Sequence, residues 1–251
     1  MRMRSLGCLA IATVLWSGAS PAGTSPGSIT RQSLLRAADL TRWSVGADVA
    51  IVNRDITVEN GPETTLKTTC ADLFLAYDFA PAVFLFITGG VGKGELEGFR
   101  EYADYRAKWS VGLGANVWSA DIESPRYLVG TLSLKALAEF ADHTSEDVDT
   151  GERLHWTEVS AALPLYYEIA EEDDVRAMPQ EARRLALHVG PAVSSVRGDY
   201  DQGSGNVSFD GDSTLGFVAG VDIYLAANLC LSAEVASIGG YTYSGGLRFH
   251  F

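Results

Sequence analysis

Eight charged or titratable side chains share the polar side of segments in which apolar and polar residues alternate. The set comprises Asp48, Lys135, Glu139, Glu158, His188, Asp222, Glu234 and Arg248. If these segments enclose an interior, the charges must be paired there, because an isolated charge is costly to remove from water. We expect Arg248 to bridge Asp48 and Glu234. We expect Lys135 to pair with Glu158, with Glu139 nearby. Such a set either lines a polar pore or fills the interior as a plug of ion pairs.

The histidines show no spacing typical of an enzyme. His188 can be drawn as a triad with Glu158 and either Ser194 or Ser160, but no motif joins these residues. The glycine-rich run around Lys93 is followed by glycine, whereas a phosphate-binding loop has Ser or Thr after its lysine. We therefore expect no catalytic residue, no metal site and no cofactor. A membrane-embedded hydrolase is the enzymatic alternative.

One acidic segment offers oxygen ligands. It carries Asp199, Asp201, Asp210 and Asp212 among glycines, without the spacing of a calcium-binding loop. We interpret it as solvated surface, with loosely held divalent cations as the alternative.

The elements that position these side chains are strands, because a period of two runs from Trp43 to Phe251. Each segment has one apolar face and one face of small, polar or charged residues. The alternation predicts about ten strands, with eight to twelve as the range: 43–51, 71–79, 83–91, 109–117, 128–140, 159–167, 185–193, 215–225, 229–235 and 241–251.

The connections between these segments fall into two kinds. Short turns at 80–82, 122–126 and 226–228 alternate with longer polar loops at 57–64, 93–106, 141–153 and 197–212. Sorting of this kind is typical of a transmembrane barrel with its long loops outside the cell. A soluble sandwich gives the same alternation without that sorting. A soluble ligand binder of the lipocalin kind is the alternative fold.

The C-terminus carries the most specific pattern. Apolar residues occupy alternate positions and the chain ends on an aromatic residue: Tyr241, Tyr243, Leu247, Phe249 and Phe251. This pattern resembles the terminal strand of Gram-negative outer-membrane β-barrel proteins, among them the small barrels of the OmpA, OmpW and opacity-protein kind. The resemblance implies a closed antiparallel up-and-down barrel over residues 43–251. It also implies that the last strand is the signal for the barrel-insertion machinery, and that the partners are outer-membrane lipid and lipopolysaccharide.

The N-terminus has the plan of a secretory signal peptide. Arg2 and Arg4 precede an apolar run from Leu6 to Trp16, and small residues follow up to Ala22. We predict a cleaved signal peptide at 1–22 and a periplasmic segment at 23–42, for which one short helix and an ordered tail are the two alternatives. Removal of the leader leaves 17 basic against 32 acidic side chains, since 2 of the 19 basic residues lie in it. This acidic balance argues against nucleic acid as a partner.

Taken together, these features predict an integral protein of the cell outer membrane. The predicted function is a structural or surface-interaction barrel with a plugged or very narrow polar lumen. A passive, porin-like channel for small solutes is the first alternative, and the hydrolase is the second.

Overall fold

A computed structural model describes residues 43–59, 61–80, 82–97, 104–122, 130–147, 149–169, 184–202, 205–226 and 228–251. The predicted signal peptide and the segment at 23–42 lie outside the described residues. The strands are β1 (Trp43–Val58), β2 (Glu63–Ala80), β3 (Val83–Leu96), β4 (Arg106–Ile122), β5 (Gly130–Glu146), β6 (Arg153–Ala162), β7 (Leu165–Ile169), β8 (Arg184–Gln202), β9 (Gly205–Ala226), β10 (Leu229–Ser237) and β11 (Gly240–His250). Within these ranges, no helix is long and apolar enough to span a bilayer.

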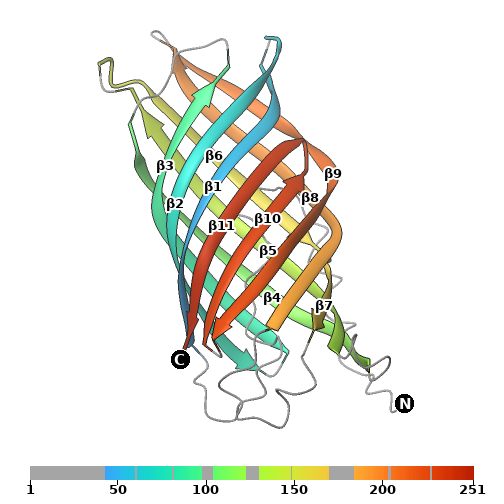
Figure 1. The fold of residues 1–251 in the computed structure, drawn as a ribbon. Coiled ribbons are helices and arrows are strands. Elements are labelled where there is room, and N and C mark those ends of the chain that lie inside the picture. The colour runs from blue at the N-terminus through green and yellow to red at the C-terminus, as the bar shows by residue number, and fades with distance from the viewer. Residues whose placement is uncertain are drawn as a thin grey trace.

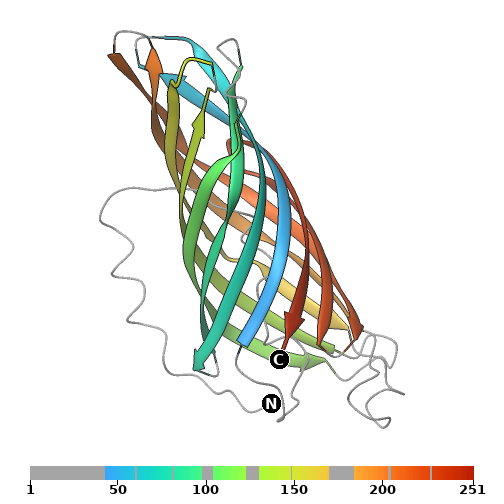
Figure 2. The ribbon, with the colours of Figure 1, turned by 90° about the vertical axis from the view of Figure 1, so that its left-hand side faces the viewer.

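The strands form one antiparallel sheet that closes on itself (Figure 1). Closure is made by β1 and β11, which pair from Ser44↔His250 to Arg54↔Gly240. β6 and β7 both lie between β5 and β8 and occupy one place in the wall, so the eleven described strands make a barrel of ten positions. The strands incline steeply to the barrel axis (Figure 2). The predicted closed antiparallel barrel of about ten strands is confirmed.

Pro164 interrupts the strand formed by β6 and β7, and a second proline, Pro191, lies on the neighbouring strand β8. The pairing stops at Ala162↔Ala192 and resumes at Leu165↔Val189 without a change of register. Across the gap, Leu163 N donates to Pro191 O at 2.9 Å. Because proline removes a ladder donor, the sequence predicts either a β-bulge or weakened pairing at this place. The pairing is interrupted as expected, and no bulge forms, because the register is the same on both sides of the break.

The barrel narrows from ten strands to eight toward its upper end as drawn in Figure 1. β10 and β11 turn back at Gly239 and Gly240, which have φ of +55° and +127° and so need glycine. A Cβ on Gly240 would also lie 2.1 Å from Asn53 O. Beyond this turn β1 pairs directly with β9, at Thr57↔Asp210 and Val58↔Phe209.

Most of the residues predicted as long loops are strand instead. β8 and β9 pair up to Gln202↔Gly205, so the predicted loop at 197–212 is a paired hairpin. β1, β3 and β5 likewise run to Val58, Leu96 and Glu146, well into the segments predicted as loops. On β1, β3 and β9 the physical reason is that Ile56, Val58, Leu96 and Phe209 point inward and bury one another. On β5 the inward His143 stacks on Trp156.

Candidate functional site

The outer wall carries a continuous apolar band. Large exposed side chains such as Val49, Leu73, Ile87, Val189 and Leu231 point away from the barrel in its ten-stranded part. Aromatic pairs lie at both limits of the band: Trp43 with Tyr77 at 4.6 Å between ring centroids, and Trp109 with Phe140 at 5.2 Å. Apolar bands flanked by aromatic residues are typical of barrels that sit in lipid.

The residues predicted as the insertion signal belong to this band. All five point outward and are exposed by 37% to 60% of their surface: Tyr241, Tyr243, Leu247, Phe249 and Phe251. The bulge in β4 between Asn116 and Trp118 adds to the same surface, since it leaves both Val117 and Trp118 exposed.

The eight charged residues predicted to share one face all lie inside the barrel. Seven of them are buried, and the side chain of Asp48 is 12% exposed. The sequence reasoning left four further inward charges out of this set: Arg54, Asp72, Lys108 and Glu168. Arg54 and Lys108 were missed because the apolar alternation on the outer face ends at Ile51 and begins at Trp109.

At the lower end of the lumen, Arg248 pairs with Asp48, as expected. Arg248 Nη2 lies 3.3 Å from Asp48 Oδ1. The second half of the predicted bridge is wrong, because Arg248 is opposite Cys230, four residues along β10 from Glu234. Glu234 Oε2 instead lies 2.9 Å from His188 Nε2.

The contact between His188 and Glu234 depends on a glycine. Gly220 is the residue of β9 that lies between them. A Cβ at Gly220 would come within 2.6 Å of His188 Nε2. The imidazole therefore reaches across β9 only because that position has no side chain.

The predicted pair of Lys135 and Glu158 is also wrong. Glu158 is opposite Ala141, six residues further along β5 than Lys135. Lys135 Nζ lies 3.1 Å from Glu168 Oε1 and 3.8 Å from the centroid of the Tyr166 ring. Neighbouring strands of a barrel are displaced along one another, so two residues at similar distances from their strand ends can lie far apart.

Glu158 takes part in a tie across the lumen. Arg54 Nε donates to Glu158 Oε1 at 2.8 Å, and Arg54 Nη1 donates to Thr242 at 2.8 Å. Ser194 Oγ donates to the same carboxylate oxygen at 2.9 Å. β1 and β6 are not neighbours in the sheet, so this contact joins opposite walls. A second buried pair joins Lys108 Nζ to Asp72 Oδ2 at 2.7 Å.

The geometry does not assemble the triad that was drawn around His188. Ser194 lies six residues from His188 on β8 and donates to Glu158, whereas His188 contacts Glu234. Ser160 is opposite Ser194 and is equally remote from the imidazole.

Apolar side chains fill the lumen between and above the charges. Phe84 and Phe86 lie against Gly114 and Gly112, where a Cβ would be 2.0 Å from either ring. Together with Phe74 they belong to a buried cluster inside the ten-stranded part. These three phenylalanines therefore pack inside the barrel and do not face lipid.

The eight-stranded part of the wall encloses a second apolar cluster, which we call the cap cluster. It consists of Ile56, Val58, Leu66, Leu96, Leu154, Trp156, Val196, Tyr200 and Phe209. The Trp156 ring stacks on His143 at 4.8 Å and 7°. Outside this cluster the wall is polar, with Asp55, Lys67 and Arg197 among its outward residues. The wall therefore reverses its polarity along its length, and we call this upper part the cap.

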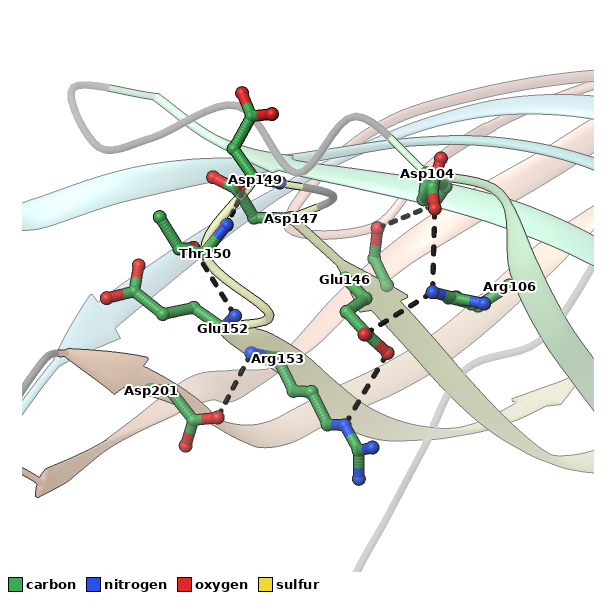
Figure 3. Close-up of polar contacts among 10 residues, drawn as sticks. Asp104, Arg106, Glu146, Asp147, Asp149, Thr150, Glu152, Arg153 and Asp201 are labelled. Atoms are coloured by element: carbon green, nitrogen blue, oxygen red, sulfur yellow. Dashed lines mark hydrogen bonds and ion pairs between the residues drawn. The ribbon is translucent and has the colours of Figure 1, made fainter.

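Ion pairs join the strand ends at the tip of the cap (Figure 3). Glu146 lies 3.3 Å from Arg106 and 3.5 Å from Arg153, and Arg106 also lies 3.5 Å from Asp104. The Arg153 backbone N–H donates to Asp201 at 3.1 Å. These contacts hold β4, β5, β6 and β8 together where the sheet ends.

The acidic residues that were considered for divalent cations do not gather into a metal site within the described residues. Asp199 lies 3.8 Å from His155, and Asp210 lies 3.4 Å from Arg197. Asp201 is held at the tip of the cap, and the side chain of Asp212 lies outside the described residues.

A closed sheet with an apolar exterior and an interior that buries its charged side chains defines a transmembrane β-barrel. A bilayer accepts strands only when the sheet has no open edge, because unpaired backbone groups are too costly in hydrocarbon. The chain is accordingly a membrane-spanning barrel.

No family model and no curated protein matches the chain. Among solved structures it is similar to an outer membrane channel from Pseudomonas putida F1, with 8% identity, a TM-score of 0.40, and coverage of 91% of this chain and 100% of that one. It is also similar to the transport unit of the autotransporter AIDA-I from Escherichia coli, with 12% identity, a TM-score of 0.39, and coverage of 89% and 94%. A third similar structure is Salmonella typhi OmpF in complex with daunomycin, at 9% identity, a TM-score of 0.17, and coverage of 83% and 97%.

Proposed function

We propose that this protein is a closed barrel of the cell outer membrane whose cap projects outside the cell as a rigid surface structure. The observation that carries this proposal is the cap cluster, in which nine buried apolar residues meet inside the lumen. Eight-stranded barrels have interiors that side chains just fill. An apolar filling of this kind leaves no polar path for ions or hydrophilic solutes.

The ten-stranded part supports the same proposal through its ion pairs. Arg54, Lys108, Lys135 and Arg248 each have a carboxylate partner within 2.7 to 3.3 Å. Such pairs favour one register of the wall, because a shifted strand would leave a buried charge alone. The interior therefore acts as a packed core with polar members.

Planar-bilayer recording tests the closed lumen. We expect the purified full-length barrel to give no steady unitary current. A variant carrying Trp156→Ala and Phe209→Ala removes two of the three aromatic side chains from the cap cluster and should give openings. Val235→Ala, on the lipid-facing wall, is the matched control and should stay silent. Steady openings in the unaltered barrel would overturn the proposal.

A second candidate function is a narrow pathway for small cations. Seven carboxylates face the lumen against four basic side chains in the part of the chain that the structure describes: Asp48, Asp72, Glu139, Glu158, Glu168, Asp222 and Glu234 against Arg54, Lys108, Lys135 and Arg248. This excess of acid favours cations over anions in any water-filled path. If currents are seen, their reversal potential in a salt gradient should indicate cation selectivity. Anion selectivity would exclude this candidate.

A further inference from the structure

The lipid-facing wall has a groove where β11, β1, β2 and β3 meet. Its volume is about 390 Å³. Small residues form its floor, among them Ala71, Gly89 and Gly245, and larger apolar residues stand beside them, among them Val49, Leu73 and Val91. Val49 and Leu73 are 62% and 69% exposed, so they project from the wall on either side of the floor.

The groove has room that the sequence leaves unfilled. A Cβ on Gly89 would meet no atom within 4 Å, and one on Gly245 would meet only Ser232 O at 3.4 Å. Side chains would therefore fit at both positions, as they do at neighbouring outward positions. Glycine weakens a strand, and in a strand interior it often marks the close approach of a ligand or another backbone.

On the inner side of the wall, the backbone beneath the groove lies close to a buried carboxylate. Asp72, which also lines the groove, is buried, and its Oδ1 lies 2.4 Å from where a Cβ of Gly90 would be. That oxygen has no hydrogen-bond partner among the described residues, whereas Asp72 Oδ2 contacts Lys108. The wall between the groove and this carboxylate is a single layer of backbone.

Charged residues of both signs lie just beyond the upper end of the groove, and the lysine nearest to the groove is Lys93. On β3, Lys93 follows Val91 by two residues and is opposite Thr69 of β2. Lys67, two residues beyond Thr69, is opposite Glu95 and lies 3.3 Å from Glu97, so it is further from the groove than Lys93 and already ion-paired. The outward side chains change from apolar to polar at this height, so the ammonium groups lie where lipid headgroups begin. An apolar groove that ends at ammonium groups fits a lipid that carries a phosphate.

We propose that this groove binds one acyl chain of a phosphorylated glycolipid of the lipid A class, with a phosphate near Lys93. The inference rests on the proposed location and orientation, since the cap end of the band faces the outer leaflet. The acyl chain covers the bare backbone at Gly89 and Gly245. Lys93 supplies a charge-assisted contact at the interface, where ammonium groups bind phosphate as point charges.

Native mass spectrometry of the full-length barrel titrated with purified lipid A tests the proposal. A variant carrying Gly89→Leu and Gly245→Leu fills the groove and should weaken binding about tenfold, which is the contribution of one well-buried apolar group. Ala138→Leu places the same side chain on the lipid-facing wall of β5, away from the groove, and should leave binding unchanged. Lys93→Gln should weaken binding about threefold, whereas Arg197→Gln, on the far side of the cap, should not.

Three results would overturn the proposal. The first is equal binding of lipid A to the unaltered and groove-filled barrels. The second is equally strong binding of phosphatidylglycerol, which would assign the groove to a phospholipid. The third is efficient disulfide formation between copies bearing Leu73→Cys, which would assign it to a second copy of the chain. If the groove-filled variant does not fold, the comparison of lipid A binding by Lys93→Gln and Arg197→Gln tests the proposal, and equal binding by these two variants would overturn it. Bilayer conductance tests the closed lumen separately, so the two proposals can fail independently.

Discussion

The tie between Arg54 and Glu158 predicts a specific pattern of stabilities. Both side chains are almost fully buried, at 6% and 3% exposure, and their contact crosses the lumen at 2.8 Å. Arg54→Met leaves the Glu158 carboxylate with the Ser194 hydroxyl as its neutral donor. Breaking one side of a buried pair costs about 3–5 kcal/mol, because the remaining charge stays uncompensated.

Removal of both charges should restore most of that loss. Replacing a buried pair with apolar residues of similar volume is often neutral or stabilising. We therefore expect the variant with Arg54→Met and Glu158→Leu to be about 2 kcal/mol or more stable than the sum of the two single changes predicts. The exposed pair of Arg197 and Asp210, at 3.4 Å with side chains 62% and 70% exposed, is the control and should couple by less than about 1 kcal/mol.

Urea unfolding of the barrel in lipid vesicles, followed by tryptophan fluorescence, measures these free energies. Heat-dependent migration on gels checks that each variant reaches the folded barrel. A coupling energy near zero for Arg54 and Glu158 would refute the reasoning, since the two charges would then be solvated independently. That result would also argue for water in the lumen and against a packed interior.

Three further predictions address the wall and its assembly. Gly220→Val should destabilise the barrel by about 1–3 kcal/mol, since its side chain would displace the buried His188 imidazole from the Glu234 carboxylate; the same urea assay measures it. An impermeant maleimide applied to intact cells should label Asp55→Cys and should not label Val49→Cys, and labelling of both or of neither would contradict the reversal of polarity along β1. Deletion of Phe251 should reduce the amount of heat-modifiable barrel in outer-membrane fractions, and an unchanged amount would contradict its role in insertion.

The direction of inward side chains was predictable from the sequence, but their partners were not. Alternation alone assigns Lys135 and Glu158 to the lumen, and both are there. A period of two says nothing about how far one strand is displaced along its neighbour. In a closed barrel that stagger accumulates around the ring. It brings Arg54 to Glu158 across 104 residues of sequence and separates Lys135 from the partner that a strand count suggests.

The cap escaped prediction because its strands alternate in the opposite sense. Along β1, the apolar residues point outward as far as Ile51, whereas Ile56 and Val58 point inward and Asp55 points outward. If the outer face is assumed to be apolar along the whole strand, the residues after Ile51 resemble a polar loop. The ten-stranded part has an apolar exterior, which suits hydrocarbon. The cap has a polar exterior and an apolar interior, which suits water. The switch on β1 falls between Ile51 and Asp55, next to the place where the β10–β11 hairpin ends and the barrel narrows to eight strands. The two changes occur at the same height, where the narrower barrel encloses the cap cluster and presents a polar outer wall.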